Sequence, residues 1–161
     1  MINKYLITSS IGIGKERLTS FDAALLKSKI GNYNLVRVSS ILPAKSTQSK
    51  HVGIPEGSVL FTAYSHISSS TFGDKLTAAV AVGFPKDKNQ VGVIMEIALA
   101  EDKENVEHKI ANMVKEALEA RGSELAELVI ETSSIEVDDS DRYFTAFSAV
   151  AMWEASYEKN V

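Results

Sequence analysis

Glu96 is the most conspicuous polar residue of the chain, because it interrupts the run 91–99, which has no other polar side chain. Burying an unpaired carboxylate costs several kcal/mol. We therefore expect Glu96 to be paired, to lie at a sheet edge or to be protonated. Burial would raise its pKa, which suits a general acid near neutral pH. The alternative is an edge-strand glutamate that points into water.

Ser39 and Ser40 follow a predicted strand at 34–38, and Pro43 then prevents continued regular pairing. Two serines at the end of a strand usually signal a turn. In a strained peptide, the Ser40 hydroxyl could instead attack the preceding carbonyl and convert the amide to an ester. The residue types alone favour the turn.

Asp22 lies three positions after Thr19 and so matches the [ST]-x-x-[DE] pattern, which predicts that it caps a helix. The segment 12–15 resembles a phosphate-binding loop only superficially, because it lacks the required spacing of glycine and lysine. The segment 31–34 reads most simply as a turn, from which the Asn34 amide could face a neighbouring site.

Composition excludes several classes of protein. The 161 residues carry 17 Lys and Arg against 21 Asp and Glu, a net charge of −4 with no basic run, so we expect no nucleic-acid partner. There is no cysteine, and His51, His66 and His108 lack ligand spacing, so we expect no metal site. No run is long and apolar enough for a membrane span or a signal peptide. We expect one soluble, cytoplasmic domain over residues 1–161.

Periodicity predicts two helices and seven strands. One helix begins near Thr19 or Ser20 and stops before Gly31, and a stronger one runs over 103–121 with Gly122 as its cap. The expected strands are 5–8, 34–38, 59–67, 76–84, 91–99, 128–137 and 143–153. Short connections among the three strands between 59 and 99 predict antiparallel hairpins.

Three strands decide the architecture. The runs 76–84, 91–99 and 143–153 are apolar or small on both alternating faces, which indicates strands covered on both sides. Two amphipathic helices can cover only one face of each sheet. The pattern therefore predicts an α+β fold, a four-layer αββα sandwich with mainly antiparallel sheets, and a subunit interface could supply further cover.

Five segments taken together resemble the pyruvoyl-dependent arginine decarboxylase family. They are FDAALL (21–26), IGNYNLVRVSSILP (30–43), LTAAVAVGFPKD (76–87), IME (94–96) and AVAMW (149–153). They cover most of the chain in order. One departure is Ala23, where some members are expected to have glycine.

The resemblance implies autocatalytic serinolysis between Ser39 and Ser40. Ser40 would attack the Ser39 carbonyl, and elimination from the ester would leave chains of residues 1–39 and 40–161, the second beginning with a pyruvoyl group. Decarboxylation of L-arginine to agmatine and CO2 would then proceed through a Schiff base, with no PLP and no metal.

The resemblance also implies the roles of the other site residues. Glu96 would be the proton donor, Asp22 would bind the guanidinium, and Asn34 would orient the Ser39 carbonyl or the substrate. Substrate contacts are expected from Leu25, Gly31, Tyr33, Ser39 and Ile41. The family forms homotrimers or hexamers with sites at subunit interfaces, and we expect Glu96 to come from a different subunit than Ser40. No role is assigned to Arg37.

Three other functions remain open. The chain could be a pyruvoyl decarboxylase for another amino acid, in which case Asp22 would meet no cation. It could be an uncleaved, non-catalytic trimeric relative, since fold does not fix function. A metal hydrolase is the most distant, because the histidines are scattered.

Overall fold

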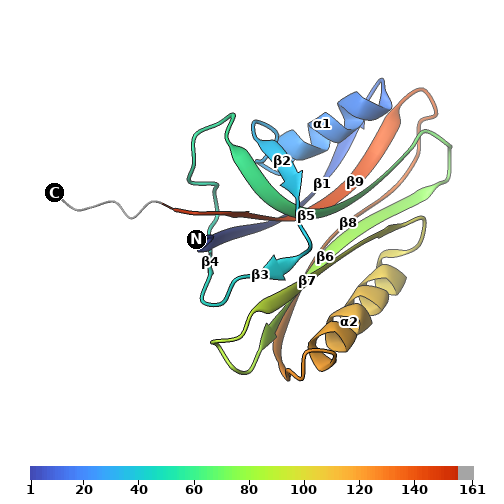
Figure 1. Ribbon diagram of the computed structural model, residues 1–161. Coiled ribbons are helices and arrows are strands. Elements are labelled where there is room, and N and C mark those ends of the chain that lie inside the picture. Colours follow the sequence, from blue (N-terminus) through green and yellow to red (C-terminus); the bar gives the residue numbers. More distant parts are fainter. Residues whose placement is uncertain (156–161) are drawn as a thin grey trace.

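The computed structural model describes residues 1–155 and, within them, places two helices on the outside of two stacked β-sheets (Figure 1). In chain order the elements are β1 (Lys4–Gly14), α1 (Arg17–Lys27), β2 (Asn34–Arg37), β3 (Ile41–Leu42), β4 (Thr47–Gln48), β5 (Val59–Ser69), β6 (Lys75–Pro85), β7 (Gly92–Leu99), α2 (Lys103–Glu119), β8 (Leu125–Glu136) and β9 (Tyr143–Trp153).

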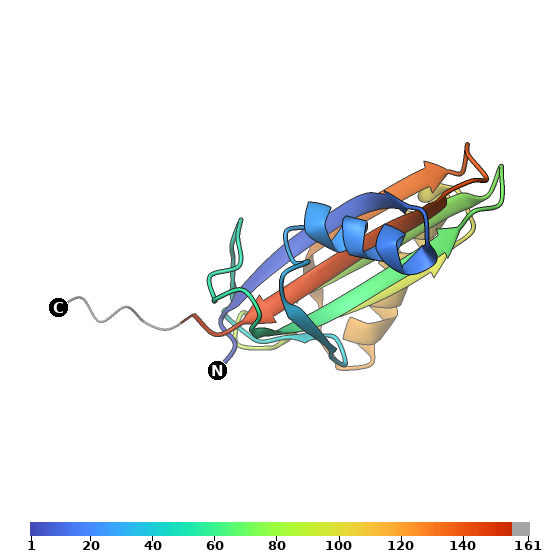
Figure 2. The same ribbon diagram turned by 90° about the horizontal axis from the view of Figure 1, so that it is seen from above.

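The two sheets share a mainly antiparallel topology. One has five strands in the order β2-β5-β9-β1-β4, and the other has four in the order β3-β7-β6-β8. Only β2 and β4 run parallel to their neighbours. Figure 1 shows α1, the five-stranded sheet, the four-stranded sheet and α2 as successive layers, and Figure 2 shows α1 lying along the outer face of its sheet. The predicted αββα sandwich is confirmed.

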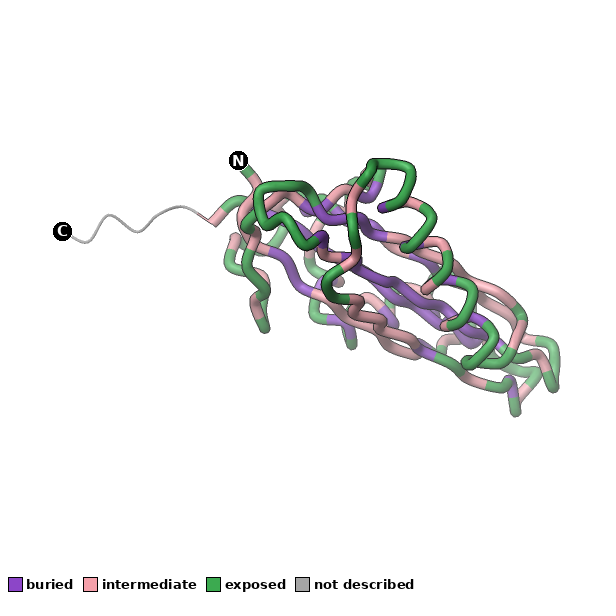
Figure 3. Tube along the Cα trace, turned by 90° about the horizontal axis from the view of Figure 1, so that it is seen from below, coloured by how far each residue is buried: buried purple, intermediate pink, exposed green. Residues whose placement is uncertain are grey.

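β6 and β9 are buried along almost their whole length, as their two-faced apolar pattern predicts (Figure 3). One face of each strand packs between the sheets, where Val80 and Val82 of β6 and Val150 of β9 share a core cluster with Ile94 of β7. The other face packs under a helix. The long central strands therefore form the rigid frame of the molecule.

α2 follows its prediction closely. It begins at Lys103 and ends at Glu119, two residues before the expected end, and Gly122 follows with φ +64°. Val106, Ile110, Val114 and Leu118 are its buried residues, at the spacing of one helical face.

α1 differs from its prediction at both ends. It begins at Arg17, so Thr19 lies in the first turn, where its Oγ1 accepts a hydrogen bond from the Glu16 N–H at 3.1 Å. Asp22 is therefore the sixth helical residue, and the prediction that it caps the helix is wrong. The helix ends at Lys27, and Lys29, with φ +63°, turns the chain in place of Gly31.

Gly12 and Gly14 permit the close packing of α1 on β1. A Cβ at Gly14 would lie 2.6 Å from the Ser20 nitrogen, and one at Gly12 would collide with the backbone of Ser20 and Ala24. The 12–15 segment is therefore strand and turn beneath the helix, in agreement with the rejection of a phosphate-binding loop.

The predicted hairpin between β5 and β6 is wrong, whereas that between β6 and β7 is confirmed. β5 pairs with β2 and β9 in one sheet, and β6 pairs with β7 and β8 in the other. A turn signal reports only that the chain reverses, and here the 70–74 connection carries the chain from one sheet to the other. Within residues 1–155 neither helix is long and apolar enough to cross a membrane.

Candidate active site

The segment Val38–Ser40 crosses from one sheet to the other. β2 ends at Arg37 at the edge of the five-stranded sheet, and β3 begins at Ile41 at the edge of the four-stranded sheet (Figure 1). Ile41 pairs with Val93 of β7, and the Ile94 N–H donates to the Ser40 carbonyl at 2.8 Å. The crossing therefore delivers Ser40 to the side of β7.

Ser40 has a left-handed backbone, with φ +71°. This region disfavours residues that carry a Cβ and costs about 1–3 kcal/mol. The side chain is nevertheless almost fully buried, at 9% exposed. The tertiary contacts on both sides of the crossing hold the residue in this conformation, so the Ser39–Ser40 peptide lies in a strained turn.

Ser40 and Glu96 are hydrogen-bonded. The Ser40 Oγ donates to Glu96 Oε1 at 2.8 Å, and it lies 3.4 Å from the Val38 carbonyl oxygen. Glu96 is paired with Val80 of β6 and so faces the space between the sheets, near the open edge of β7. The expectation that Glu96 is paired is confirmed, and its partner comes from 56 positions earlier in the chain.

Burial raises the pKa of Glu96, and the Ser40 hydrogen bond and the charge of Arg37 partly oppose that increase. Across the sheet Glu96 pairs with the uncharged Val80, and Arg37 is the cation that acts on the pKa of Glu96. A carboxyl group in this setting can accept a proton and return it at a pH above the usual glutamate range.

Arg37, to which the sequence assigned no role, is fixed against Tyr64. Its Nη2 donates to the Tyr64 carbonyl oxygen at 2.7 Å, and its Cζ lies 4.2 Å from the centroid of the Tyr64 ring. A signal for this contact exists in the sequence. Arg37 lies two residues after Leu35 on β2, so the two side chains share one face of the strand. Arg37 therefore brings a charge onto a face that is otherwise apolar.

The other predicted site residues lie around α1 and the connection from α1 to β2. Asp22 is exposed on α1, and Leu25 packs against the apolar cluster beneath that helix. The Tyr33 hydroxyl donates to the Ile54 carbonyl at 3.2 Å, and Asn34 Nδ2 donates to the Gly57 carbonyl at 2.7 Å. Gly31 is needed for a close approach, because a Cβ there would lie 2.8 Å from the Leu26 nitrogen.

The structure thus separates the predicted site into two groups within one chain. Ser39, Ser40, Ile41 and Glu96 form one group at the sheet crossing. Asp22, Leu25, Gly31, Tyr33 and Asn34 form the other, and the hydrogen bonds of Tyr33 and Asn34 go to the 54–57 segment. The expectation that Glu96 comes from a different subunit than Ser40 is wrong, because β3 pairs with β7 of the same chain.

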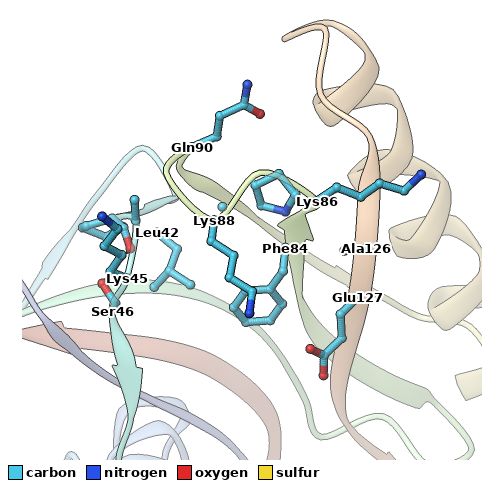
Figure 4. A pocket seen from close by; sticks show the side chains of 13 residues that line it. Leu42, Lys45, Ser46, Phe84, Lys86, Lys88, Gln90, Ala126 and Glu127 are labelled. Atoms are coloured by element: carbon cyan, nitrogen blue, oxygen red, sulfur yellow. Dashed lines mark hydrogen bonds between the residues drawn. The ribbon is translucent and has the colours of Figure 1, made fainter.

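A separate pocket of about 300 Å³ lies beyond β3 (Figure 4). Its apolar wall includes Leu42 and Phe84, and Lys45, Lys86 and Lys88 lie around it. Neither Ser40 nor Glu96 lines it, and Lys86 is paired with Glu124. Among residues 1–155 there is also no group of three His, Cys, Asp or Glu side chains that could hold a metal ion.

The Ser40 group has the parts needed for an acyl shift. The Ser40 hydroxyl follows the Ser39 carbonyl, its Oγ has a carboxylate acceptor at 2.8 Å, and its backbone is strained. A hydroxyl becomes an effective nucleophile when a base takes its proton. The arrangement can therefore attack the peptide bond that precedes it.

Comparison with known proteins finds one family. A family model described as pyruvoyl-dependent arginine decarboxylase matches residues 4–157. The protein of that name from Methanococcus maripaludis strain C5 is 38% identical over 151 residues, covering 94% of this chain and 90% of its own. Those of Methanocaldococcus jannaschii and Thermococcus kodakarensis are 38% and 40% identical over 141 residues, covering 87% of this chain and 83% and 88% of their own.

Proposed function

Because this chain belongs to the pyruvoyl-dependent arginine decarboxylase family, we propose that it cuts its own Ser39–Ser40 bond and then decarboxylates L-arginine to agmatine and CO2. The observation that carries the proposal is the strained Ser40, whose hydroxyl is already hydrogen-bonded to Glu96. The family name supports the arginine substrate and the pyruvoyl group, and the geometry supports Ser40 as the origin of that group.

In the cleavage step, the Ser40 Oγ attacks the Ser39 carbonyl carbon, and Glu96 accepts the proton of the Ser40 hydroxyl. The bond from that carbon to the Ser40 nitrogen breaks, and the nitrogen takes up a proton. A base then removes the Cα proton of residue 40 as its Cβ–Oγ bond breaks, which releases Ser39 as a new carboxylate and leaves a Cα–Cβ double bond. Tautomerisation to an imine, addition of water and loss of ammonia leave the pyruvoyl group at position 40. The products are residues 1–39 and 40–161.

The pyruvoyl group supplies a ketone for the substrate amine and a sink for the electrons that CO2 leaves behind, so neither PLP nor a metal is part of the proposal. Glu96 then serves as an acid. Its partly buried carboxyl, with a raised pKa, can hold a proton for the substrate Cα at a pH where an exposed glutamate is ionised.

Asp22 provides the carboxylate for the substrate guanidinium, since a carboxylate accepts two parallel N–H bonds from that group. In this proposal Leu25, Gly31 and Tyr33, which lie with Asp22, contact the substrate from one side. Ser39 and Ile41 contact it from the cleavage point, and Asn34 orients the Ser39 carbonyl or the substrate. The exposure of Asp22 leaves its carboxylate free for this contact.

A homotrimer, alone or paired into a hexamer, would bring the two groups of site residues together at subunit interfaces. An apolar strip beside the site supports this. Val36, Val59 and Phe61 lie on one face of the β2–β5 edge and are 44%, 52% and 39% exposed. Apolar side chains gathered at an edge strand are typical of a protein interface.

Intact-mass measurement of freshly purified protein tests the proposal, with Ser40→Ala as the variant that cannot cleave. We expect fragments of roughly 4 and 13 kDa, the larger with a pyruvoyl end, and full-length mass for the variant. The cleaved protein should release CO2 from L-arginine. A wild-type chain that stays at full length after long incubation would indicate the non-catalytic relative instead.

A further inference from the structure

Arg37 is the last residue of β2, and two different contacts with Tyr64 hold its side chain. The Nη2 donates to the Tyr64 carbonyl at 2.7 Å, and the guanidinium lies over the ring, with Cζ 4.2 Å from its centroid. Tyr64 is in turn packed against Phe21 and Phe147, with ring centroids 6.4 and 5.7 Å away. An exposed arginine is thus anchored on a rigid aromatic base.

The anchor lies at the start of the sheet crossing. Only Val38 and Ser39 separate Arg37 from Ser40, and the far side of the crossing is fixed by the hydrogen bond between the Ile94 N–H and the Ser40 carbonyl. With both ends held, the short segment has little freedom, and Ser40 keeps its φ of +71°. The Arg37–Tyr64 contact therefore supports the strained turn from the β2 side.

The charge of Arg37 acts on the same site. Its guanidinium favours the ionised form of Glu96, against the effect of burial. Across the sheet Glu96 pairs with Val80 of β6, which is uncharged, and Glu131 of β8 lies on the far side of Val80. Ser40 contributes a neutral hydroxyl.

We propose that Arg37, anchored on Tyr64, is a positioning residue for self-cleavage, which holds the Ser39–Ser40 turn so that the Ser40 hydroxyl stays hydrogen-bonded to Glu96. This rests on the proposed function. In the step concerned, the bond between Oγ and the Ser39 carbonyl carbon forms, the bond from that carbon to the Ser40 nitrogen breaks, and the proton passes from Oγ to Glu96 and on to the nitrogen.

The experiment follows cleavage of full-length precursor made by cell-free synthesis, with intact mass recorded over time from acid to mildly alkaline pH. Arg37→Gln removes the charge but keeps an N–H donor. We expect it to cleave about tenfold or more slowly, because hydrogen bonds to charged groups are the stronger ones. Its rate should also reach half of its maximum at a higher pH than in the wild type, because removal of a nearby cation disfavours the carboxylate.

Arg37→Lys keeps the charge and loses the planar stack, so it should cleave slowly with the wild-type half-maximal pH. Arg17→Gln is the matched control: Arg17 also lies over a tyrosine ring, that of Tyr143 at 5.5 Å, and it is not among the charges that act on Glu96. It should cleave as the wild type does.

An Arg37→Gln variant that cleaves at the wild-type rate would overturn the inference. A fallen rate with the wild-type half-maximal pH would support positioning by the Tyr64 contacts without an effect of the charge on Glu96. A wild-type precursor that never cleaves would instead refute the proposed function, so the two failures are distinguishable.

Discussion

Glu96 and Glu131 lie on opposite sides of Val80 in one row across the four-stranded sheet. Each accepts a hydrogen bond from a serine, Glu96 from Ser40 at 2.8 Å and Glu131 from Ser9 at 2.6 Å. The two pairs differ in backbone: Ser9 is an extended residue in the middle of β1, whereas Ser40 is left-handed in a turn. The chain therefore contains its own control for the effect of backbone strain on a Ser–Glu pair.

Glu96→Gln should slow self-cleavage by about 10²- to 10⁴-fold, because an amide cannot accept the Ser40 proton. Glu131→Gln, in the same row and also bonded to a serine, should cleave at the wild-type rate. Intact mass over time checks both variants. Equal cleavage by Glu96→Gln and the wild type would remove Glu96 from the cleavage step.

The raised pKa of Glu96 also predicts how stability varies with pH. The folded protein holds the Glu96 proton to a higher pH than the unfolded chain, in which the pKa of glutamate is about 4.3. The wild type should therefore lose stability relative to Glu96→Gln as pH rises from that value through the raised pKa of the folded state. Below this window the penalty is absent.

Thermal unfolding measures this effect in a Ser40→Ala background, in which both proteins remain uncleaved. The double variant should have the higher melting temperature at neutral pH, and the difference should shrink on acidification. A difference that stays constant across the window would contradict the assignment of a raised pKa to Glu96.

Asp22→Asn should lower kcat/KM for L-arginine by roughly 30- to 5000-fold, because truncating one partner of a hydrogen-bonded charge pair costs about 2–5 kcal/mol. Ala23→Gly, its neighbour in α1, is the control and should keep the substrate preference. Steady-state assays with arginine and with uncharged amino acids check this. An unchanged preference in Asp22→Asn would favour a decarboxylase for another amino acid.

If the proposed trimer forms through the apolar strip of Val36, Val59 and Phe61, Phe61→Glu should dissociate it and abolish decarboxylation, because the substitution places a charge in that strip. Phe72→Glu is the matched control: Phe72 is 70% exposed in the 70–74 connection, away from the strip. Light scattering after size-exclusion chromatography measures the mass. A Phe61→Glu variant with the wild-type mass would place the interface elsewhere.

The pKa of His66 responds to the charges of Arg37 and Arg17, so it can test their positions without an activity assay. The His66 ring lies 4.6 Å from Phe21 and 6.1 Å from Tyr64, and partial burial, followed by the charges of Arg37 and Arg17, lowers its pKa. Arg37→Gln and Arg17→Gln should each raise the pKa of His66, as measured by NMR titration, and Arg142→Gln should not. An unmoved pKa in Arg37→Gln would show that its guanidinium lies away from this cluster.

Much of the fold could be predicted because its signals are periodic and local. The strand Tyr143–Trp153 has the predicted bounds, and α2 differs only at its end. The start of α1 was missed because Thr19 fits the capping pattern of a helix that begins later. The actual start depends on the close packing of α1 on β1, which Gly12 and Gly14 permit. The β5–β6 crossing was missed because a turn signal does not name the partner strand.

The candidate site also contains features that local patterns predict and features that depend on tertiary structure. Glu96 was noticed because a single carboxylate breaks an apolar run. Its hydrogen bond with Ser40 spans 56 positions and depends on the pairing of β3 with β7, which no local pattern reports. The left-handed backbone of Ser40 is equally hidden, because serine carries no sequence signal for positive φ. The family resemblance supplied the residue roles that the patterns alone left open.

The position of β1 determines what a cut after Ser39 would do to the molecule. β1 belongs to residues 1–39, yet it is hydrogen-bonded on one side to β9 along all of its 11 residues and on the other to β4, both from residues 40–161. The two products would stay interlocked as a heterodimer. Once denatured, however, they would have to find each other by diffusion, so refolding would become concentration-dependent. The intact chain can fold as a single molecule, so folding before the cut avoids this dependence on concentration.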